Sequence, residues 1–270
     1  MLDLLRIRAA RSLSTIPFPP PAGPDGAGLP ERFRGRPVVH PGRCPQGCRD
    51  CADACPTDAI ALDGAAVALD LGKCVFCVEC TRACPEGAIR FTRDYRLAAS
   101  ARADLVVGDA LEAPLARALD EKVRRLFGRS LKLRQVSAGG CNGCEAELVA
   151  SGNVIFDLAR FGVQFVASPR HADGLVVTGP VTLNMRRALE ETYAATPAPK
   201  IVIAVGACAI SGGPFFDSER QHGGAGAVLP VDLYIAGCPP HPLTILDGML
   251  RLLGKIEGAG GAGDAGGRRR

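Results

Sequence analysis

Short, mostly apolar runs that end near glycine recur in the second half of this 270-residue chain. They predict buried parallel strands, because a strand covered on both faces of a sheet is apolar throughout. Helical spacing of apolar residues lies between and after these runs, over 182–193, where Thr182 is a plausible cap, and over 242–253. This alternation predicts a doubly wound, flavodoxin-like α/β domain with a parallel sheet over 129–255. The predicted strands are 163–168, 174–179, 201–206 and 233–237.

The first half of the chain lacks this alternation. Residues 1–16 predict a short amphipathic helix, 17–30 a proline-rich linker, and 111–127 a connecting helix. No apolar run approaches the roughly 20 residues that a membrane span needs. The expected divisions are a helix and linker (1–36), a small cysteine-rich domain (37–95), a connecting helix and linker (96–128), the α/β domain (129–255) and a disordered tail (256–270).

Eight of the twelve cysteines form two runs in the small domain, and each run ends in Cys-Pro. From the second cysteine onward the runs repeat at an offset of 29 residues, and the likeness continues from Cys55-Pro-Thr-Asp-Ala-Ile60 to Cys84-Pro-Glu-Gly-Ala-Ile89. The second run has the bacterial ferredoxin spacing C-x2-C-x2-C-x3-C-P. The runs are Cys44, Cys48, Cys51 and Cys55, and then Cys74, Cys77, Cys80 and Cys84.

This spacing predicts two [4Fe–4S] clusters with crossed ligands in a small α+β ferredoxin-like domain. Cysteines three residues apart wrap three corners of a cubane cluster, and the fourth thiolate comes from the other run. One extra residue separates Cys44 from Cys48, and we expect Gly47 to absorb it in a tight turn. The expected ligand sets are Cys44, Cys48, Cys51 and Cys84 for one cluster, and Cys55, Cys74, Cys77 and Cys80 for the other.

Zinc and disulfide bonds are the alternatives for these eight cysteines. Zinc sites usually pair two C-x2-C knuckles across a longer loop, whereas here four cysteines lie within about a dozen residues. Disulfides need an oxidising compartment. The start of the chain, Met-Leu-Asp-Leu-Leu-Arg-Ile-Arg, has neither the apolar core of a signal peptide nor a twin-arginine motif.

The other four cysteines gather near the ends of predicted strands. Cys141 and Cys144 form a C-x-x-C pair, Cys208 follows the strand at 201–206, and Cys238 follows the strand at 233–237. Because ligands collect at the carboxyl ends of parallel strands, we expect these thiols at one edge of the sheet. The set fits a third [4Fe–4S] cluster, with zinc, or a redox C-x-x-C pair beside two free thiols, as alternatives.

Four segments of the α/β domain carry a family resemblance: Gly140-Cys-Asn-Gly-Cys-Glu145, residues 168–182, residues 206–213 and Gly237-Cys-Pro-Pro-His-Pro242. Together they resemble the small electron-transfer subunit shared by group 4 [NiFe]-hydrogenases of the formate hydrogenlyase type and respiratory complex I, where it is the 20 kDa subunit. The resemblance covers about 129–250. It implies that Cys141, Cys144, Cys208 and Cys238 hold the cluster nearest the catalytic site. Residues 1–95 separately resemble the two-cluster ferredoxin-like subunit of the same complexes.

The resemblance implies an electron-transfer subunit with three [4Fe–4S] clusters and no catalytic centre of its own. Cys141-Asn-Gly-Cys144 has the hydrogenase form of the first motif, whereas complex I subunits carry adjacent cysteines there. The implied partners are a catalytic large subunit of the [NiFe]-hydrogenase type, integral membrane subunits and an electron donor protein. The chain would be cytoplasmic and peripheral on the inner face of the cell membrane. A complex I-like quinone oxidoreductase subunit is the runner-up, and a zinc-containing structural or binding module is the alternative from another class.

A few charged residues add candidates near these sites. Glu145 and Glu147 are candidates for a proton relay toward the partner, or else are carboxylates that favour the start of a helix. Arg170 and His171 either shield the anionic cluster or form a surface pair at a strand end. The net charge of +4 includes three terminal arginines, so we expect no nucleic-acid partner. The histidines His40, His222 and His241 have no ligand spacing and are expected in loops.

Overall fold

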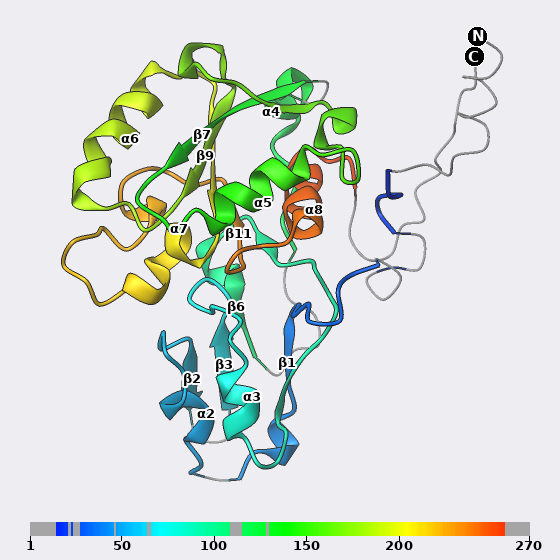
Figure 1. Ribbon diagram of the computed structural model, residues 1–270, viewed down its shortest axis with the longest axis vertical. Coiled ribbons are helices and arrows are strands. Elements are labelled where there is room, and N and C mark those ends of the chain that lie inside the picture. Colours follow the sequence, from blue (N-terminus) through cyan, green and yellow to red (C-terminus); the bar gives the residue numbers. More distant parts are fainter. Residues whose placement is uncertain are drawn as a thin grey trace, which may run out of the picture.

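The computed structural model describes residues 15–20, 23, 28–45, 47–63, 66–108, 115–127 and 130–256. The helix predicted for 1–16 and the predicted tail therefore lie almost wholly outside the described residues. Figure 1 shows the larger α/β domain above a smaller, cysteine-rich half.

Six strands form the sheet of the α/β domain, in the order β5-β11-β10-β9-β7-β8. Strand β5 pairs antiparallel with β11, and the other neighbours are parallel. Without β5 the order along the chain is 2-1-3-4-5, as in flavodoxin, which agrees with the predicted fold class. The strands are β5 (Ala98–Ala99), β7 (Leu131–Ser137), β8 (Val163–Phe165), β9 (Gly174–Thr178), β10 (Ile201–Val205) and β11 (Leu233–Ile235).

The sheet separates two hydrophobic cores. Alternate residues of a strand face opposite sides, so Leu175 and Val177 of β9 pack into one core and Val176 into the other. Leu189 of helix α6 (Leu183–Ala195) belongs to the first core, which continues into the cysteine-rich half. Helices α5 (Gly143–Ser151) and α8 (Pro242–Leu252) cover the second core. Helices α6 and α8 begin where the sequence predicts them.

The cysteine-rich half contains a strand–helix–strand unit that occurs twice. The first strand of the first unit pairs with the last strand of the second, and the two inner strands pair with each other, all antiparallel. The 29-residue repeat of the sequence is therefore also a repeat of structure. The first unit is β1 (Pro37–Val39), α2 (Asp50–Asp53) and β2 (Ile60–Asp63), and the second is β3 (Ala66–Asp70), α3 (Glu79–Ala83) and β4 (Ile89–Phe91).

Residues 98–107 join the two halves by contributing a strand to each sheet. Strand β5 extends the large sheet, and β6 (Val106–Val107) pairs with β3 in the small one. Between them the Arg102 guanidinium donates two hydrogen bonds to the Asp70 carboxylate, at 2.8 and 2.6 Å. The predicted linker region is thus part of both folded sheets.

The helix predicted over 111–127 is shorter than expected. Only α4 (Glu121–Phe127) is helical, residues 115–120 are not, and 111–114 lie outside the described residues. Ala116 N donates to Ala98 O and Leu119 N donates to Leu252 O, both at 2.9 Å. These amides bond to other elements of the fold, so they are not available for helical bonds.

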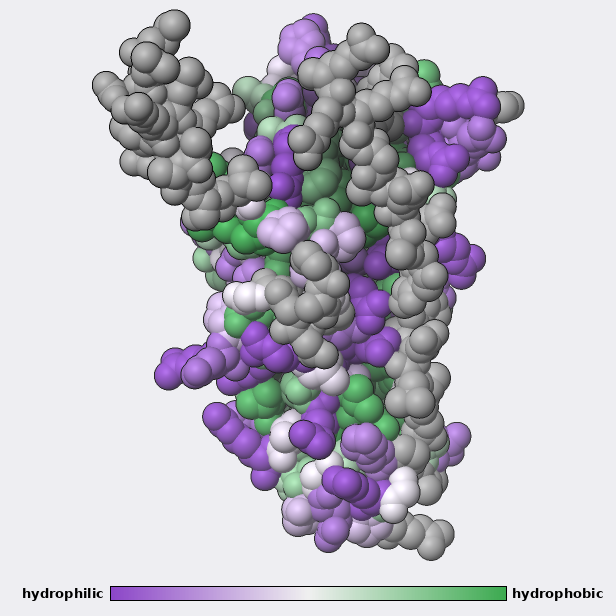
Figure 2. Space-filling model, turned by 90° about the vertical axis from the view of Figure 1, so that its right-hand side faces the viewer, coloured by the Kyte–Doolittle hydropathy of each residue, from purple (hydrophilic) through white to green (hydrophobic). Residues whose placement is uncertain are grey.

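The surface mixes polar and apolar residues. On the face in Figure 2, hydrophobic residues form separate patches among polar ones. Among the described residues, no helix has the length and apolar character needed to cross a bilayer.

Candidate metal centres

The structure brings the cysteines of the two runs together in a crossed arrangement. Burial, followed by the neighbouring thiols of Cys48 and Cys84, raises the pKa of Cys44. Burial, followed by Cys44 and Cys84, also raises the pKa of Cys51. Cys84 therefore lies with the first run although it ends the second.

The reciprocal set forms around Cys55. Burial raises the pKa of Cys74 to about 12 and the pKa of Cys80 to about 11, and the thiols of Cys55 and Cys77 add to both shifts. All four residues line one small cavity in the cysteine-rich half. Crowded, buried thiols ionise only with a positive partner, and the irons of a cluster would supply that charge.

Backbone amides point at the thiols that cross between the runs. Ala59 N–H donates to Cys55 Sγ at 3.3 Å, and Ala88 N–H donates to Cys84 Sγ at 3.3 Å. These two bonds are equivalent in the repeat. Hydrogen bonds to sulfur stabilise thiolate charge and help to set iron–sulfur potentials, so the donors and thiols together fit a [4Fe–4S] cluster.

The thiols of each set are neighbours, but they do not converge on a single point as the ligands of one metal ion do. Within the described ranges, no three Cys, His, Asp or Glu side chains converge closely enough to hold a single metal ion. A cubane cluster binds its thiolates at four separate corners. Its ligands therefore do not need to converge as the ligands of one zinc ion do.

The turn expected at Gly47 is present, with φ at +80°. Phe76, the equivalent residue of the second run, also has a positive φ of 55° although that run has no extra residue. The left-handed turn therefore belongs to the cysteine loop itself, and the extra residue is not its cause.

The remaining four cysteines meet at the carboxyl edge of the large sheet. Cys141 lies between β7 and α5, and Cys144 is the second residue of α5. Cys208 lies in helix α7 (Ala207–Ser211) after β10, and Cys238 follows β11. The pKa of Cys144 is raised mainly by burial, and further by the neighbouring thiols of Cys208, Cys238 and Cys141. The pKa of Cys208 is raised to about 11, mainly by burial and further by the thiols of Cys238 and Cys141. Cys141 and Cys238 are exposed, so this set is open on one side.

A glycine leaves room for one of these thiols. Gly206 has φ at +89°, and a Cβ at that position would lie 2.4 Å from Cys144 Sγ. Only glycine combines this conformation with so close an approach.

The two halves meet beside these sites. The pKa of Cys238 is raised mainly by burial, and further by the thiols of Cys141 and Cys77. Because thiols affect each other in this way only when they are near, Cys77 of the cysteine-rich half lies close to the third set. Ser211 Oγ of α7 also donates to Gly72 O at 2.8 Å. The set that contains Cys77 therefore adjoins the set that contains Cys238.

The two candidate acidic residues have different surroundings. Glu145 is buried, and its Oε1 accepts hydrogen bonds from Ser137 Oγ at 2.6 Å and Thr178 Oγ1 at 2.7 Å. Burial opposes ionisation, but these bonds outweigh it and the net pKa of Glu145 is lowered. Burial raises the pKa of Glu147, which lines a cavity beside Cys238. A proton relay stays a prediction for both.

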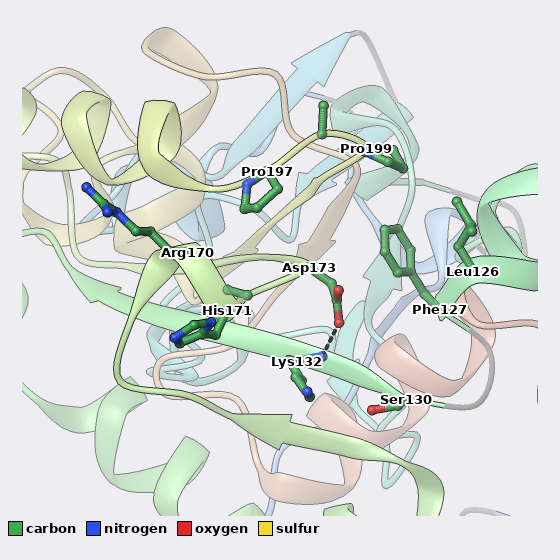
Figure 3. Close-up of a pocket in the computed structure, with 11 residues that line it drawn as sticks. Leu126, Phe127, Ser130, Lys132, Arg170, His171, Asp173, Pro197 and Pro199 are labelled. Carbon is green, nitrogen blue, oxygen red and sulfur yellow. Dashed lines mark hydrogen bonds between the residues drawn. The ribbon is translucent and has the colours of Figure 1, made fainter.

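Arg170 and His171 lie at the other edge of the sheet. They belong to a short turn (Pro169–His171) that precedes β9. They line a surface pocket with Ser130, just before β7, and Pro199, two residues before β10. Figure 3 shows this pocket. The cysteines follow the opposite ends of these strands, so the predicted shielding of a cluster is wrong.

His241 has a structural role that sequence reasoning missed. Its Nδ1 accepts the Leu243 N–H at 3.2 Å and caps helix α8, whose first residue is Pro242. Its ring packs edge-on against Phe33 and Phe156. The available signal was its place directly before a proline that begins a helix.

The chain is similar to several known proteins. A family model described as NADH ubiquinone oxidoreductase, 20 Kd subunit, matches residues 141–252. The probable membrane-bound hydrogenase subunit mbhJ of Pyrococcus furiosus is 43% identical over 51% of this chain and 84% of its own length. Formate hydrogenlyase subunit 7 of Escherichia coli is 42% identical over 55% of this chain and 61% of its own length. An NADH-quinone oxidoreductase subunit of Heliobacterium modesticaldum is 45% identical over 44% of this chain and 69% of its own length.

The matches cover about half of this chain, and they include relatives from hydrogenases and from NADH-quinone oxidoreductases. The residues that the family model matches include Cys141, Cys144, Cys208 and Cys238. The chain therefore belongs to the family of the NADH:ubiquinone oxidoreductase 20 kDa subunit, whose members are subunits of oxidoreductase complexes.

Proposed function

We propose that this chain is an electron-transfer subunit that holds three [4Fe–4S] clusters in a membrane-associated oxidoreductase complex. When bound, such clusters accept and release single electrons. The twelve cysteines form three sets of four neighbours, and each set is composed of thiols alone. Thiolates are the ligands that iron–sulfur clusters prefer.

The observation that carries the proposal is that Cys77 in one half is close enough to Cys238 in the other to raise the pKa of Cys238. It supports an order of the three sets, with the Cys44 set first, the Cys77 set second and the Cys238 set third. A separate zinc site in each half would not require the sets to adjoin. Electron transfer does require closely spaced centres, so the order favours an electron-transfer path from a donor at the small half to a partner at the sheet edge.

The small half has the features of a two-cluster ferredoxin. Its repeated strand–helix–strand unit, the crossed cysteines and the equivalent amide bonds to Cys55 and Cys84 support that assignment. Each unit supplies three neighbouring cysteines to one set and a fourth to the other. We propose the two clusters there on this symmetry.

The carboxyl edge of the large sheet is the proposed docking face for a catalytic large subunit. Cys141 and Cys238 are exposed there, and so are two large apolar side chains, Leu183 at 47% and Phe215 at 46%. Leu183 begins the helix after β9, and Phe215 follows the helix that carries Cys208. Exposed apolar residues beside an open site are typical of an interface.

The hydrogenase branch is the proposed identity of the partner. Cys141-Asn-Gly-Cys144 has the spacing expected for group 4 [NiFe]-hydrogenases, and two of the similar proteins are hydrogenase or formate hydrogenlyase subunits. A complex I-like quinone reductase is the second candidate, because the NADH-quinone oxidoreductase relative is similar to the same extent.

Metal and sulfide analysis of the anaerobically purified chain tests the proposal. Three clusters predict about twelve irons and about twelve labile sulfides per chain. About eight irons with one zinc would remove the third cluster and leave a ferredoxin-like module. Zinc in place of iron throughout would overturn the proposed function.

A further inference from the structure

One buried hydroxyl distinguishes the two thiol sets of the cysteine-rich half. Thr57 is only 2% exposed and stands two residues after Cys55. Its Oγ1 lies 3.9 Å from Cys55 Sγ, within the range of a hydrogen bond to sulfur. Thr57 also lines the small cavity that the thiols of the Cys77 set surround. Within the part of the chain that the structure describes, this sulfur is the one hydrogen-bond partner of the hydroxyl.

The other run has no hydroxyl at the equivalent position. In the 29-residue repeat, Thr57 corresponds to Glu86, which is exposed. An ionised carboxylate has no proton to donate. The backbone amide bonds to Cys55 and Cys84, in contrast, have the same length of 3.3 Å in both units. The hydroxyl at position 57 is therefore a difference between two otherwise equivalent thiol environments.

The protonation state of Cys55 decides the direction of the bond to Thr57. A free thiol can either donate to the hydroxyl or accept from it. A thiolate that ligates iron has lost its proton, so only the hydroxyl can then donate. Because Thr57 is almost inaccessible to solvent, water is not an alternative partner, and a buried hydroxyl without a partner is unfavourable. A charged sulfur at Cys55 is thus the acceptor that suits this donor.

A donor to a ligating sulfur changes the redox potential of a cluster. Reduction adds a negative charge, which a hydrogen bond to sulfur stabilises, so the potential rises. Burial acts in the opposite direction, because a low dielectric disfavours the more negative state. Two members of the Cys77 set, Cys74 and Cys80, are only 8% and 7% exposed. A donor within this set therefore opposes the effect that burial has on its cluster.

We propose that the Thr57 hydroxyl donates to the Cys55 thiolate and raises the potential of the cluster held by the Cys77 set. This inference rests on the proposed function, because it takes Cys55 as a cluster ligand. The Cys44 set lacks the equivalent donor, and the Cys77 set adjoins the Cys238 set. The hydroxyl thus makes electron transfer from the first cluster to the second more favourable, on the route toward the third. Thr57 acts through Cys55 and is a positioning residue.

Redox titration of the anaerobically purified full chain, followed by EPR spectroscopy, tests this role. Thr57→Val keeps the shape and removes the hydroxyl, so we expect a more negative midpoint potential for one cluster. That cluster is identified as the one whose signal Cys55→Ser abolishes. Thr57→Ser keeps the hydroxyl and should retain the wild-type potential. Thr196→Val is the matched control and should change no potential, since Thr196 is also 2% exposed but donates to Thr192 O at 2.9 Å.

Thr57→Ala removes the hydroxyl without adding bulk, and it decides the question if Thr57→Val binds less iron. An unchanged potential in Thr57→Ala, or an equal negative shift in Thr57→Ser, overturns the inference and leaves the proposed function standing. Loss of the cluster from both Thr57→Val and Thr57→Ala also overturns it, because the hydroxyl is then required for assembly. Iron and sulfide analysis of the wild type separates the two levels: zinc in the Cys77 set would refute the proposed function, and this inference with it.

Discussion

At the scale of single residues, the crossed cysteine sets depend on where each run ends. Cys55 and Cys84 stand at equivalent places, each accepts an amide from four residues later, and each lies with the opposite run. Cysteine spacing is a local property, so the sequence alone predicts which thiols become neighbours.

Cys84→Ser tests the crossing. We expect iron to fall from about twelve to about eight per chain, with loss of the cluster at Cys44, Cys48 and Cys51. The Cys77 set and the third set adjoin, so their reduced clusters should still show magnetic interaction in EPR spectra. Cys55→Ser is the counterpart and should abolish that interaction. The opposite assignment of the two variants would contradict the crossing.

The surroundings of other residues could not be predicted from the sequence, because they are formed by segments that lie far away along the chain. Arg170 and His171 lie in the connection from β8 to β9. This connection passes across β7, because β8 ends opposite Leu133 on one side and β9 begins opposite Leu133 on the other. That crossing carries the pair to the amino edge of the sheet. Glu145 likewise obtains its hydrogen-bond donors from two strands, β7 and β9.

At the scale of elements, the starts of α6 and α8 and the buried strands were predictable, although the side chain of Thr182 makes no capping hydrogen bond. The strands β9 and β10 are buried throughout and read as apolar runs. Strand β7 was missed because Lys132 and other polar residues interrupt its apolar positions. The helix expected from residue 111 was overridden by backbone hydrogen bonds to β5 and α8, which no local pattern records.

Gly206→Ala tests the geometry that follows β10. The added Cβ would meet Cys144 Sγ at 2.4 Å, in a conformation that disfavours side chains. We expect loss of the third cluster, with iron near eight per chain. Gly223→Ala is the control for conformation alone, since it has a positive φ of 75° and nothing within 4 Å. Full iron content in Gly206→Ala would show that the close approach is not needed.

Arg251→Leu tests a buried ion pair in α8. Arg251 Nε donates to Asp247 Oδ2 at 2.9 Å, and the two side chains are only 7% and 2% exposed. Removing the cation leaves a buried carboxylate, which typically destabilises a protein by about 3–5 kcal/mol. The double variant Asp247→Leu/Arg251→Leu should recover most of that loss in denaturant unfolding.

A surface pair of the same spacing is the control for this helix experiment. Arg187 and Glu191 of α6 form an i,i+4 pair whose side chains are 87% and 65% exposed. Arg187→Leu should leave the free energy of unfolding almost unchanged, because water screens the pair. Equal losses for Arg187→Leu and Arg251→Leu would mean that burial of the α8 pair has no energetic effect.

At the scale of the whole molecule, the halves share a core and a segment, so they form one structure. The core on one side of the large sheet includes Cys74 and Cys80 of the small half and Ala236 of the large one. The fold class of the large α/β half was predictable from the sequence, and the cysteine sets stay a prediction as cluster ligands. The proximity of Cys77 to Cys238 was not predictable, because it depends on how the two halves pack together.

Cys141→Ala in the purified complex tests the wire as a whole. Cys141 is exposed at the proposed docking face and adjoins Cys208 and Cys238. We expect electron delivery from a reduced donor to the catalytic subunit to stop, while that subunit keeps its own metal. Hydrogen evolution and nickel content are the measurements. Full activity with the third cluster absent would refute the wire.

The strands at residues 98–107 also fix how many copies of each half an assembly contains. One segment pairs with β11 on one side and with β3 on the other, so it ties the two halves together at both sheets. When two modules belong to one chain, the length and stiffness of the linker set how often they meet, and short flexible linkers give effective concentrations in the millimolar range. The junction beside Cys77 and Cys238 is therefore formed at any dilution, and its stoichiometry is one to one by covalent structure.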